Sequence, residues 1–142
     1  TAAVMTASVL GAPLMNDFCI ISLSDLLTPA AVIRKRLAAA AAGDFVICLY
    51  NPRSHTRTKP LDDALAILRS LLSPDTVVGI VRNAGRNGQS QWIGTLETVE
   101  PEQVDMFCVM IVGNSATRVL DGRMVTARGY EKTGGEKGYG RP

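Results

Sequence analysis

The chain has 142 residues, 46% of them hydrophobic and 20% charged, and it carries a net charge of +2. This length and composition fit one globular domain and exclude a disordered segment. The small net charge does not indicate a nucleic-acid partner, and no apolar run reaches the ~20 residues of a membrane-spanning helix. We therefore expect neither nucleic acid nor membrane among its partners.

The first elements are predicted by apolar content and by flanking turn residues. Small apolar helix formers over residues 1–10 predict a short helix, and residues 17–23 (DFCIISL) predict a strand. Thr28 stands just before a proline and predicts the cap of a helix over residues 29–42, which a glycine ends.

The stretch that follows joins a buried strand to a basic loop. Residues 44–50 have the apolar content expected of a strand covered on both faces. Pro52 has no N–H for a strand ladder, so it ends the strand and favours extended geometry at Asn51. The loop carries four basic side chains, namely Arg53, His55, Arg57 and Lys59.

The later part of the chain completes the sheet. Its predicted elements are a helix over 60–72, an antiparallel hairpin of strands over 76–81 and 90–99, a helical turn over 101–105, a strand over 107–112 and a hairpin over 119–125. With the two earlier strands, these predict an α/β fold with a mixed five-stranded sheet flanked by helices. We expect the Gly- and Lys-rich residues 131–142 to be a flexible tail.

Three predicted strand ends carry unusual polar sequence, at residues 50–54, 82–86 and 113–118. If these ends gather on one rim of the sheet, their guanidinium groups would suit carboxylates or phosphates. The arginines concerned are Arg53, Arg82, Arg86 and Arg118. The alternative for each loop alone is an ordinary turn with solvated arginines.

Other polar residues have two readings each. Asp25 is either a base or a residue that orders the turn before the second helix. His55 either titrates near neutral pH or is a surface residue, and Trp92 is expected to pack in the interior. Three cysteines in apolar runs indicate buried, reduced thiols and, with a single histidine, leave too few ligands for a structural metal site. They are Cys19, Cys48 and Cys108.

Five sequence segments resemble those of a known family. They are residues 10–14 (LGAPL), 17–29 (DFCIISLSDLLTP), 49–54 (LYNPRS), 79–86 (GIVRNAGR) and 111–115 (IVGNS). They closely resemble the precorrin-3B C17-methyltransferases, together with the cobalt-factor III C17-methyltransferases, a branch of the tetrapyrrole methylase family. The resemblance covers roughly residues 1–130.

That family builds its enzymes from two α/β domains with S-adenosylmethionine bound between them. The resemblance implies that residues 1–130 are the carboxyl-terminal domain, with residues 1–15 as the last helix and linker of a missing amino-terminal domain. It also implies a cytoplasmic homodimer that methylates C17 of precorrin-3B, or of its cobalt form, with ring contraction in cobalamin biosynthesis. Because the first domain completes the cofactor pocket, the chain alone is not expected to catalyse the reaction.

The resemblance implies cofactor contacts for six residues and substrate contacts for three. The cofactor residues are Thr1, Ala2, Tyr50, Asn51, Asn83 and Ala84. Asn51 stands where other branches of the family have methionine. The carboxylates of the tetrapyrrole substrate are assigned to Arg53, Arg82 and Arg86, and no residue is assigned a catalytic role. A noncatalytic binding or dimerisation module with the same fold is the alternative.

Overall fold

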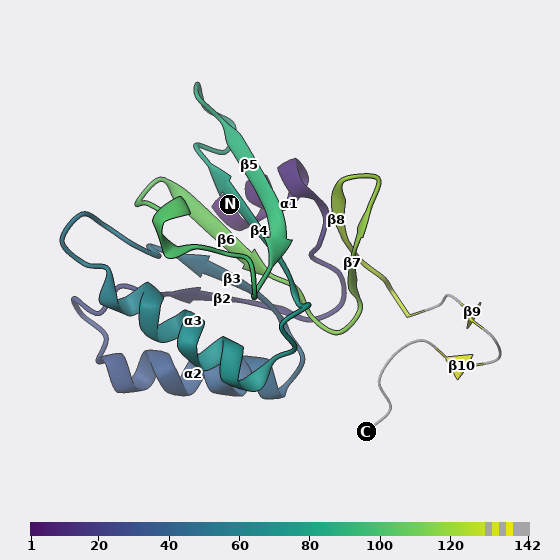
Figure 1. Cartoon of the computed structure of the whole chain (residues 1–142), viewed down its shortest axis with the longest axis horizontal. Helices are drawn as coiled ribbons and strands as arrows, with labels where there is room; N and C mark the ends of the chain where they lie inside the picture. The colour runs from purple at the N-terminus through teal and green to yellow at the C-terminus, as the bar shows by residue number, and fades with distance from the viewer. Residues whose placement is uncertain (130–131, 134–135, 138–142) are drawn as a thin grey trace.

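The computed structural model describes residues 1–129, 132–133 and 136–137. A mixed sheet of five strands, in the order β2-β3-β6-β4-β5, forms its centre (Figure 1). The strands are β2 (Phe18–Ser22), β3 (Val46–Tyr50), β4 (Val77–Arg82), β5 (Ser90–Thr95) and β6 (Cys108–Val112). β2 and β3 are parallel, and the other neighbouring pairs are antiparallel. The predicted α/β fold with a mixed five-stranded sheet is therefore confirmed.

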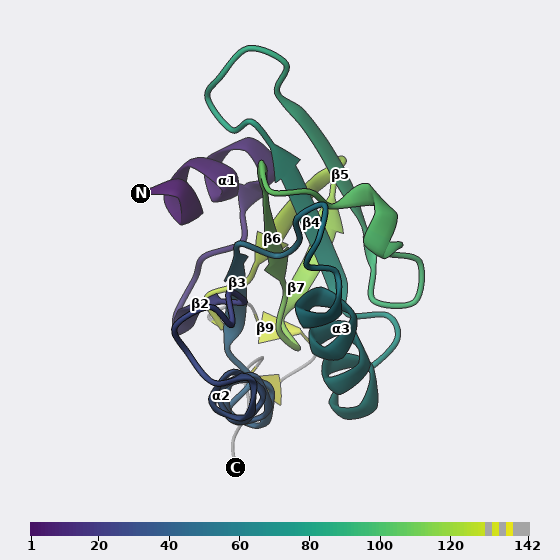
Figure 2. The same ribbon diagram turned by 90° about the vertical axis from the view of Figure 1, so that its left-hand side faces the viewer.

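Helices cover both faces of this sheet. Figure 2 shows α2 (Ala30–Ala42) and α3 (Lys59–Leu71) on one side and α1 (Ala2–Leu10) on the other. The face of α2 that packs inward consists of Ile33, Leu37, Ala40 and Ala41, as its periodicity predicts. Along β3, Leu49 packs with the α2 and α3 side and Cys48 with the α1 side, so the strand is buried on both faces as predicted.

A smaller sheet extends the α1 side. It consists of β1 (Gly11–Ala12), β8 (Arg123–Thr126) and β7 (Thr117–Leu120). The hairpin of β7 and β8 was predicted from its Asp121-Gly122 turn, where φ is 49° and 71°. The parallel pairing of β1 with β8 was not predicted, because a strand of two residues is too short to show an apolar periodicity. Met124 of β8 is fully buried against α1, which joins the two sheets into one core.

The remaining elements are short. They are η1 (Pro101–Gln103), β9 (Lys132–Thr133) and β10 (Glu136–Lys137). Of the predicted tail, 131–142, only the antiparallel pair β9 and β10 is described, and the rest lies outside the described residues. No helix within the described part of the chain is long and apolar enough to cross a membrane.

Two local predictions are wrong. α2 begins at Ala30 without a side-chain cap, because Pro29 is extended (ψ 137°) and takes the cap position predicted for Thr28. Asn51 is not extended, since its φ is 47°. Asparagine tolerates this left-handed geometry better than most residues, and here its Nδ2 donates a hydrogen bond to Ser22 Oγ at 3.1 Å.

Candidate functional site

Strand direction decides which loops meet. β3 and β4 both run antiparallel to β6, which lies between them, so their carboxyl ends reach the same edge as the amino end of β6. Residues 113–118 leave β6 at the opposite edge. The condition that three strand ends gather on one rim is therefore met by two of them, and residues 113–118, with Arg118, lie at the other edge.

The polar residues at the opposite edge have a structural role. Asn114 is 6% exposed, and its Nδ2 donates to the backbone oxygen of Asp44 at 3.2 Å. Its Oδ1 accepts the N–H of Ala116 at 2.9 Å. The hydroxyls of Thr117 and Thr126 bond to each other at 2.8 Å. The Asn114 contact with Asp44 holds this edge to the loop before β3, and the bond between the two threonines joins β7 to β8.

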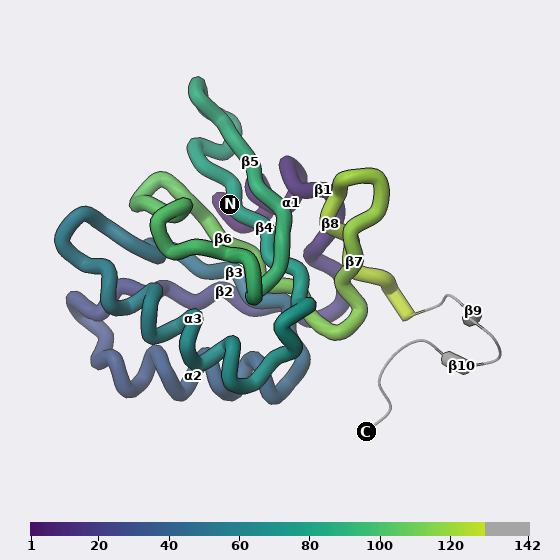
Figure 3. Tube along the Cα trace, in the orientation of Figure 1, coloured from purple at the N-terminus to yellow at the C-terminus, as the bar shows by residue number. Residues whose placement is uncertain are grey.

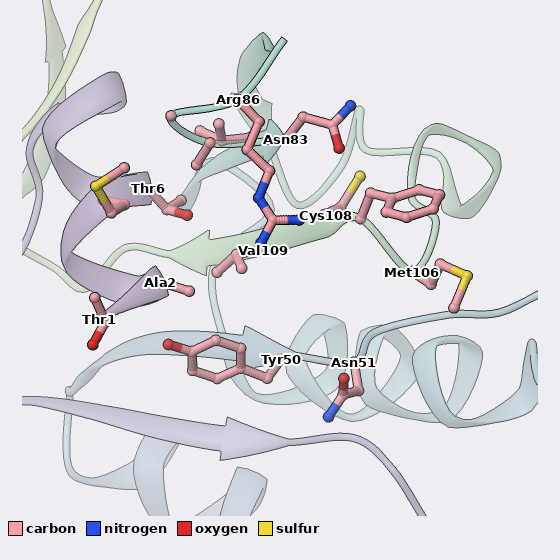
Figure 4. Close-up of a pocket in the computed structure, with 15 residues that line it drawn as sticks. Thr1, Ala2, Thr6, Tyr50, Asn51, Asn83, Arg86, Met106, Cys108 and Val109 are labelled. Atoms are coloured by element: carbon pink, nitrogen blue, oxygen red, sulfur yellow. The ribbon is translucent and has the colours of Figure 1, made fainter. Parts of the chain in front are cut away.

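At the shared edge lies a cleft of about 510 Å³, between α1 and the ends of β3, β4 and β6 (Figure 4). The cleft is lined by Thr1, Ala2, Met5, Thr6, Tyr50, Asn51, Val81, Asn83, Ala84, Gly85, Arg86, Met106, Phe107, Cys108 and Val109. Six of these are the residues to which the sequence assigns cofactor contacts. The structure thus brings together residues 1–2, 50–51 and 83–84, which are far apart in the sequence.

Tyr50 connects the sheet to the first turn of α1. Its Oη accepts the backbone N–H of Ala3 at 2.8 Å. This bond satisfies one of the amide groups that the start of a helix leaves without an intrahelical partner. The phenol proton remains available for a ligand in the cleft. The contact also fixes Thr1 and Ala2 at the mouth of the cleft.

Tight turns shape the other wall. Asn83 directly follows β4 with a φ of 52°, just as Asn51 follows β3 with a φ of 47°. Gly85 has a φ of 71°, which glycine adopts without strain, and only the flexible end of the exposed Met5 side chain lies close to it. From this turn the β4–β5 connection extends beyond the sheet (Figure 3).

Arg86 supplies the charge inside the cleft. Figure 4 shows its side chain entering from the β4–β5 connection, with the guanidinium between Thr6 and Cys108. Within the described part of the chain, the guanidinium has neither a hydrogen-bond nor an ion-pair partner. None of the described residues lining the cleft is acidic. Arg86 therefore lies among the predicted cofactor residues, not beside the other two predicted substrate arginines.

Arg53 and Arg82 line a neighbouring groove, which we call the basic groove after these two side chains, although Glu102 and Asp105 line it as well. It is lined by Arg53, Ser54, His55, Thr58, Arg82, Glu102, Val104, Asp105, Met106 and Phe107, and has a volume of about 490 Å³. Arg53 donates to the backbone oxygen of Pro101 at 2.7 Å. Arg82 Nε donates to Asp105 Oδ2 at 2.8 Å, and its guanidinium lies 5.4 Å from the centroid of the Phe107 ring.

Asp105 is the centre of this pairing. Burial opposes its ionisation, but hydrogen bonds from Arg82, from the Phe107 N–H and from Cys108 hold the pKa of Asp105 below its ordinary value. The carboxylate is therefore ionised at neutral pH, and the two acidic residues of the groove, Asp105 and Glu102, balance its two arginines. Both arginines keep other N–H groups with which they can bind a ligand.

The remaining candidates have ordinary structural surroundings. Asp25 forms an ion pair with Arg57, and Lys59 pairs with Asp63 at 2.9 Å, so two cations of the basic loop are neutralised. Trp92 packs against the core as predicted, and His55 is exposed.

The three cysteines are free, as predicted, although Cys19 is only half-buried. Burial raises the pKa of Cys48 to about 12 and of Cys108 to about 11, so both are neutral thiols at physiological pH. Burial also raises the pKa of Cys19. Cys108, which lines the cleft, is therefore a poor nucleophile.

Sequence reasoning missed one wall of the cleft entirely. Residues 106–109 reach it only because β6 inserts between β3 and β4. Thr6 was counted among the small helix formers of residues 1–10, and the polar residue on the buried face of α1 was the signal that could have identified it.

The chain is similar to known proteins in sequence and in structure. Residues 1–100 match the family model described as tetrapyrrole (corrin/porphyrin) methylases. The chain is 54% identical over 130 residues to a protein of Salmonella typhimurium named probable cobalt-factor III C(17)-methyltransferase. The match covers 92% of this chain and 54% of that relative.

Two further relatives extend the comparison. A precorrin-3B C(17)-methyltransferase of a Sinorhizobium species is 41% identical over 121 residues, which are 85% of this chain and 48% of the relative. A crystal structure of the methyltransferase CobJ superimposes with a TM-score of 0.86 at 39% identity, covering 89% of this chain and 53% of that one. The chain thus spans about half the length of each of these relatives.

Proposed function

Because the chain belongs to the tetrapyrrole (corrin/porphyrin) methylases, we propose that it is the second half of a methyltransferase acting on C17 of cobalt-factor III or precorrin-3B. The methyl donor in this proposal is S-adenosylmethionine, and the transfer accompanies contraction of the macrocycle in cobalamin biosynthesis. The observation that carries the proposal is the cleft, because every residue assigned to the cofactor from the sequence lines it. The names of the Salmonella and Sinorhizobium relatives support the substrate.

The character of the cleft fits this cofactor. Its volume of about 510 Å³ lies within the ~300–1,000 Å³ of typical small-molecule sites. Val81 and Val109 offer apolar walls, whereas the side chains of Asn51 and Asn83 offer neutral donors and acceptors. When bound, S-adenosylmethionine would supply an electrophilic methyl group on a sulfonium centre. The chain's own contribution is to hold and orient its ligands, which is the main requirement of a direct displacement.

The basic groove supports the substrate half of the proposal. It adjoins the cleft, because Met106 and Phe107 line both. A tetrapyrrole whose carboxylates bind Arg53 and Arg82 would therefore lie next to the cleft. Guanidinium groups suit such carboxylates because they donate two parallel hydrogen bonds. Arg86 lines the cleft and not this groove.

Calorimetric titration with S-adenosylhomocysteine tests the cofactor assignment. We propose to titrate the 142-residue chain and a chimera in which the preceding half of the Salmonella relative is joined to Thr1. The chimera should bind with an affinity well above that of the chain, because a family member builds this site from two domains. A chimera that neither binds S-adenosylhomocysteine nor methylates a tetrapyrrole would refute the enzyme and favour a noncatalytic module.

The substitution Ala84→Leu in the chimera tests the cofactor assignment at a single residue. Ala84 lines the cleft, so a leucine there should fill space that the ligand needs and abolish measurable binding. Ala31→Leu is the matched control, because Ala31 is exposed on α2, on the other side of the sheet. Circular dichroism should show both variants folded. Undiminished affinity in Ala84→Leu would contradict the assignment.

The proposal also includes the cytoplasm as the location and a homodimer as the assembly. Free cysteines in the described part of the chain support a reducing compartment. Sedimentation equilibrium of the chimera tests the dimer, and a monomer at micromolar concentration would contradict it.

A further inference from the structure

Thr6 carries a polar group that the fold itself does not use. Thr6 is 0% exposed, and its Oγ1 is the only buried side-chain nitrogen or oxygen without a hydrogen-bond partner in the part of the chain that the structure describes. It lies on the inner face of α1 among Ala3, Ala7 and Leu10, where every other residue is apolar. A buried hydroxyl without a partner is unfavourable and calls for a physical explanation.

The helix itself offers a partner that Thr6 does not take. Threonine and serine hydroxyls within helices commonly bond to a carbonyl one turn earlier. Ser8 does so in the same helix, donating to Met5 O at 2.8 Å. The Thr6 hydroxyl instead turns toward the interior of the cleft, as Figure 4 shows.

The surroundings of this hydroxyl indicate the chemistry of its partner. Val81 lines the same part of the cleft, and Ala84 packs against the apolar cluster that contains Ala3 and Ala7. Neither the N–H nor the C=O of Ala84 has a hydrogen-bond partner among the described residues. The Arg86 guanidinium lies beside Thr6, but the side chains that surround the hydroxyl on α1 and β4 are apolar, and a charged ligand group would lose its hydration against them at high cost. A neutral ring with hydrogen-bonding edges, such as a nucleoside, would match these neutral donors and acceptors.

A ligand can reach Thr6 if neighbouring side chains move. Met5 and Arg86 are both exposed and line the cleft beside it. No ion pair holds Arg86 to another described residue, so its side chain can change rotamer without breaking one. Because Thr6 is 0% exposed, an entering ring would have to displace these side chains to reach its hydroxyl.

We propose that the Thr6 hydroxyl hydrogen-bonds the nucleoside half of the cofactor and thereby helps to select an adenosyl ligand. This inference rests on the proposed function, because it takes S-adenosylmethionine as the occupant of the cleft. It adds Thr6 on α1 to the residues that were assigned to the cofactor from the sequence.

Two substitutions separate the hydroxyl from the shape of the side chain. Thr6→Val keeps the shape and removes the hydroxyl, whereas Thr6→Ser keeps the hydroxyl. Binding is measured calorimetrically on the chimera with S-adenosylhomocysteine and with 5′-methylthioadenosine, a neutral nucleoside without the amino-acid half. Stability is measured on the 142-residue chain by urea unfolding, where no ligand is present.

Thr6→Val should weaken binding of both probes by about fivefold, the effect of one net hydrogen bond. Thr6→Ser should stay within about twofold of the unsubstituted chimera. The urea midpoint of Thr6→Val should equal or exceed that of the unsubstituted chain, because no internal bond is lost. This combination of weaker binding with undiminished stability is not expected of a purely structural residue.

Three results would overturn the inference. Unchanged binding in Thr6→Val would show that the hydroxyl does not contact the ligand. A loss confined to S-adenosylhomocysteine would assign it to the amino-acid half. A clear fall in the urea midpoint would mean that the hydroxyl has an internal partner. Failure of the proposed function is distinct, because the unsubstituted chimera would then bind neither probe.

Discussion

Gly79 of β4 sets how closely α1 approaches the sheet. A Cβ at this position would lie 2.5 Å from Leu10 Cδ1 and 3.0 Å from Met124 Sδ. Leu10 is 1% exposed and Met124 is 0% exposed, so neither side chain can swing into solvent. Gly79→Ala must therefore displace α1 or strain its core contacts.

The size of this effect follows from two opposing terms. Overpacking a core by one methyl group typically costs about 1–3 kcal/mol. Replacing glycine by alanine also lowers the conformational entropy of the unfolded chain, which stabilises the folded state by about 0.4–1 kcal/mol. We expect Gly79→Ala to lower the free energy of unfolding by about 1–2 kcal/mol. Leu10→Ala alone should cost about 2–5 kcal/mol through the cavity that it leaves.

A double-mutant cycle tests the contact itself. In the pair Gly79→Ala with Leu10→Ala, the new methyl group enters the space vacated by leucine, so the double variant should be more stable than the two single effects predict. The coupling should be about 1–2 kcal/mol. Urea unfolding of the four proteins, followed by circular dichroism, measures it. Additivity within about 0.3–0.5 kcal/mol would refute the reasoning.

Two further predictions concern ionisable groups. The pKa of Asp105 is lower in the folded chain than its ordinary value of about 3.9, so its carboxylate adds stability above about pH 4 that is lost as the pH falls through the lowered pKa. Between about pH 5 and about pH 3 the urea midpoint should fall more steeply for the unsubstituted chain than for Asp105→Asn, and parallel curves would contradict this. Cys48 and Cys108, with pKa values of about 12 and about 11, should resist iodoacetamide at neutral pH and react only after unfolding. Mass spectrometry of tryptic peptides would detect early labelling, which would count against their burial.

The strands could be predicted because each is a short apolar run between turn residues. The prediction failed at one boundary, where the strand expected over residues 90–99 ends at Thr95. Leu96 and Val99 are buried and continue the apolar pattern, but they do so from a turn. The Thr98 Oγ1 accepts the N–H of Thr95 at 3.0 Å and closes that turn. Apolar periodicity cannot separate a buried turn from a strand.

The site could be predicted in part, from short sequence segments at strand ends. Such segments contain Tyr50, Asn51, Asn83 and Ala84, and the structure brings these residues to one cleft. Strand direction is not a local property, so the sequence could not show that Arg118 lies at the opposite edge. The contribution of residues 106–109 depends on the position of β6 within the sheet, which is set by pairing between distant segments.

The two left-handed asparagines that follow β3 and β4 have a consequence for binding. Asn51 and Asn83 hold the backbone at both strand ends in a conformation that few residues adopt readily. The main chain that forms this part of the cleft is therefore ordered before a ligand arrives. Such preorganisation lowers the conformational entropy lost on binding. The affinity of the cleft for a ligand then depends more on how well the ligand fits than on the entropy of ordering these two strand ends.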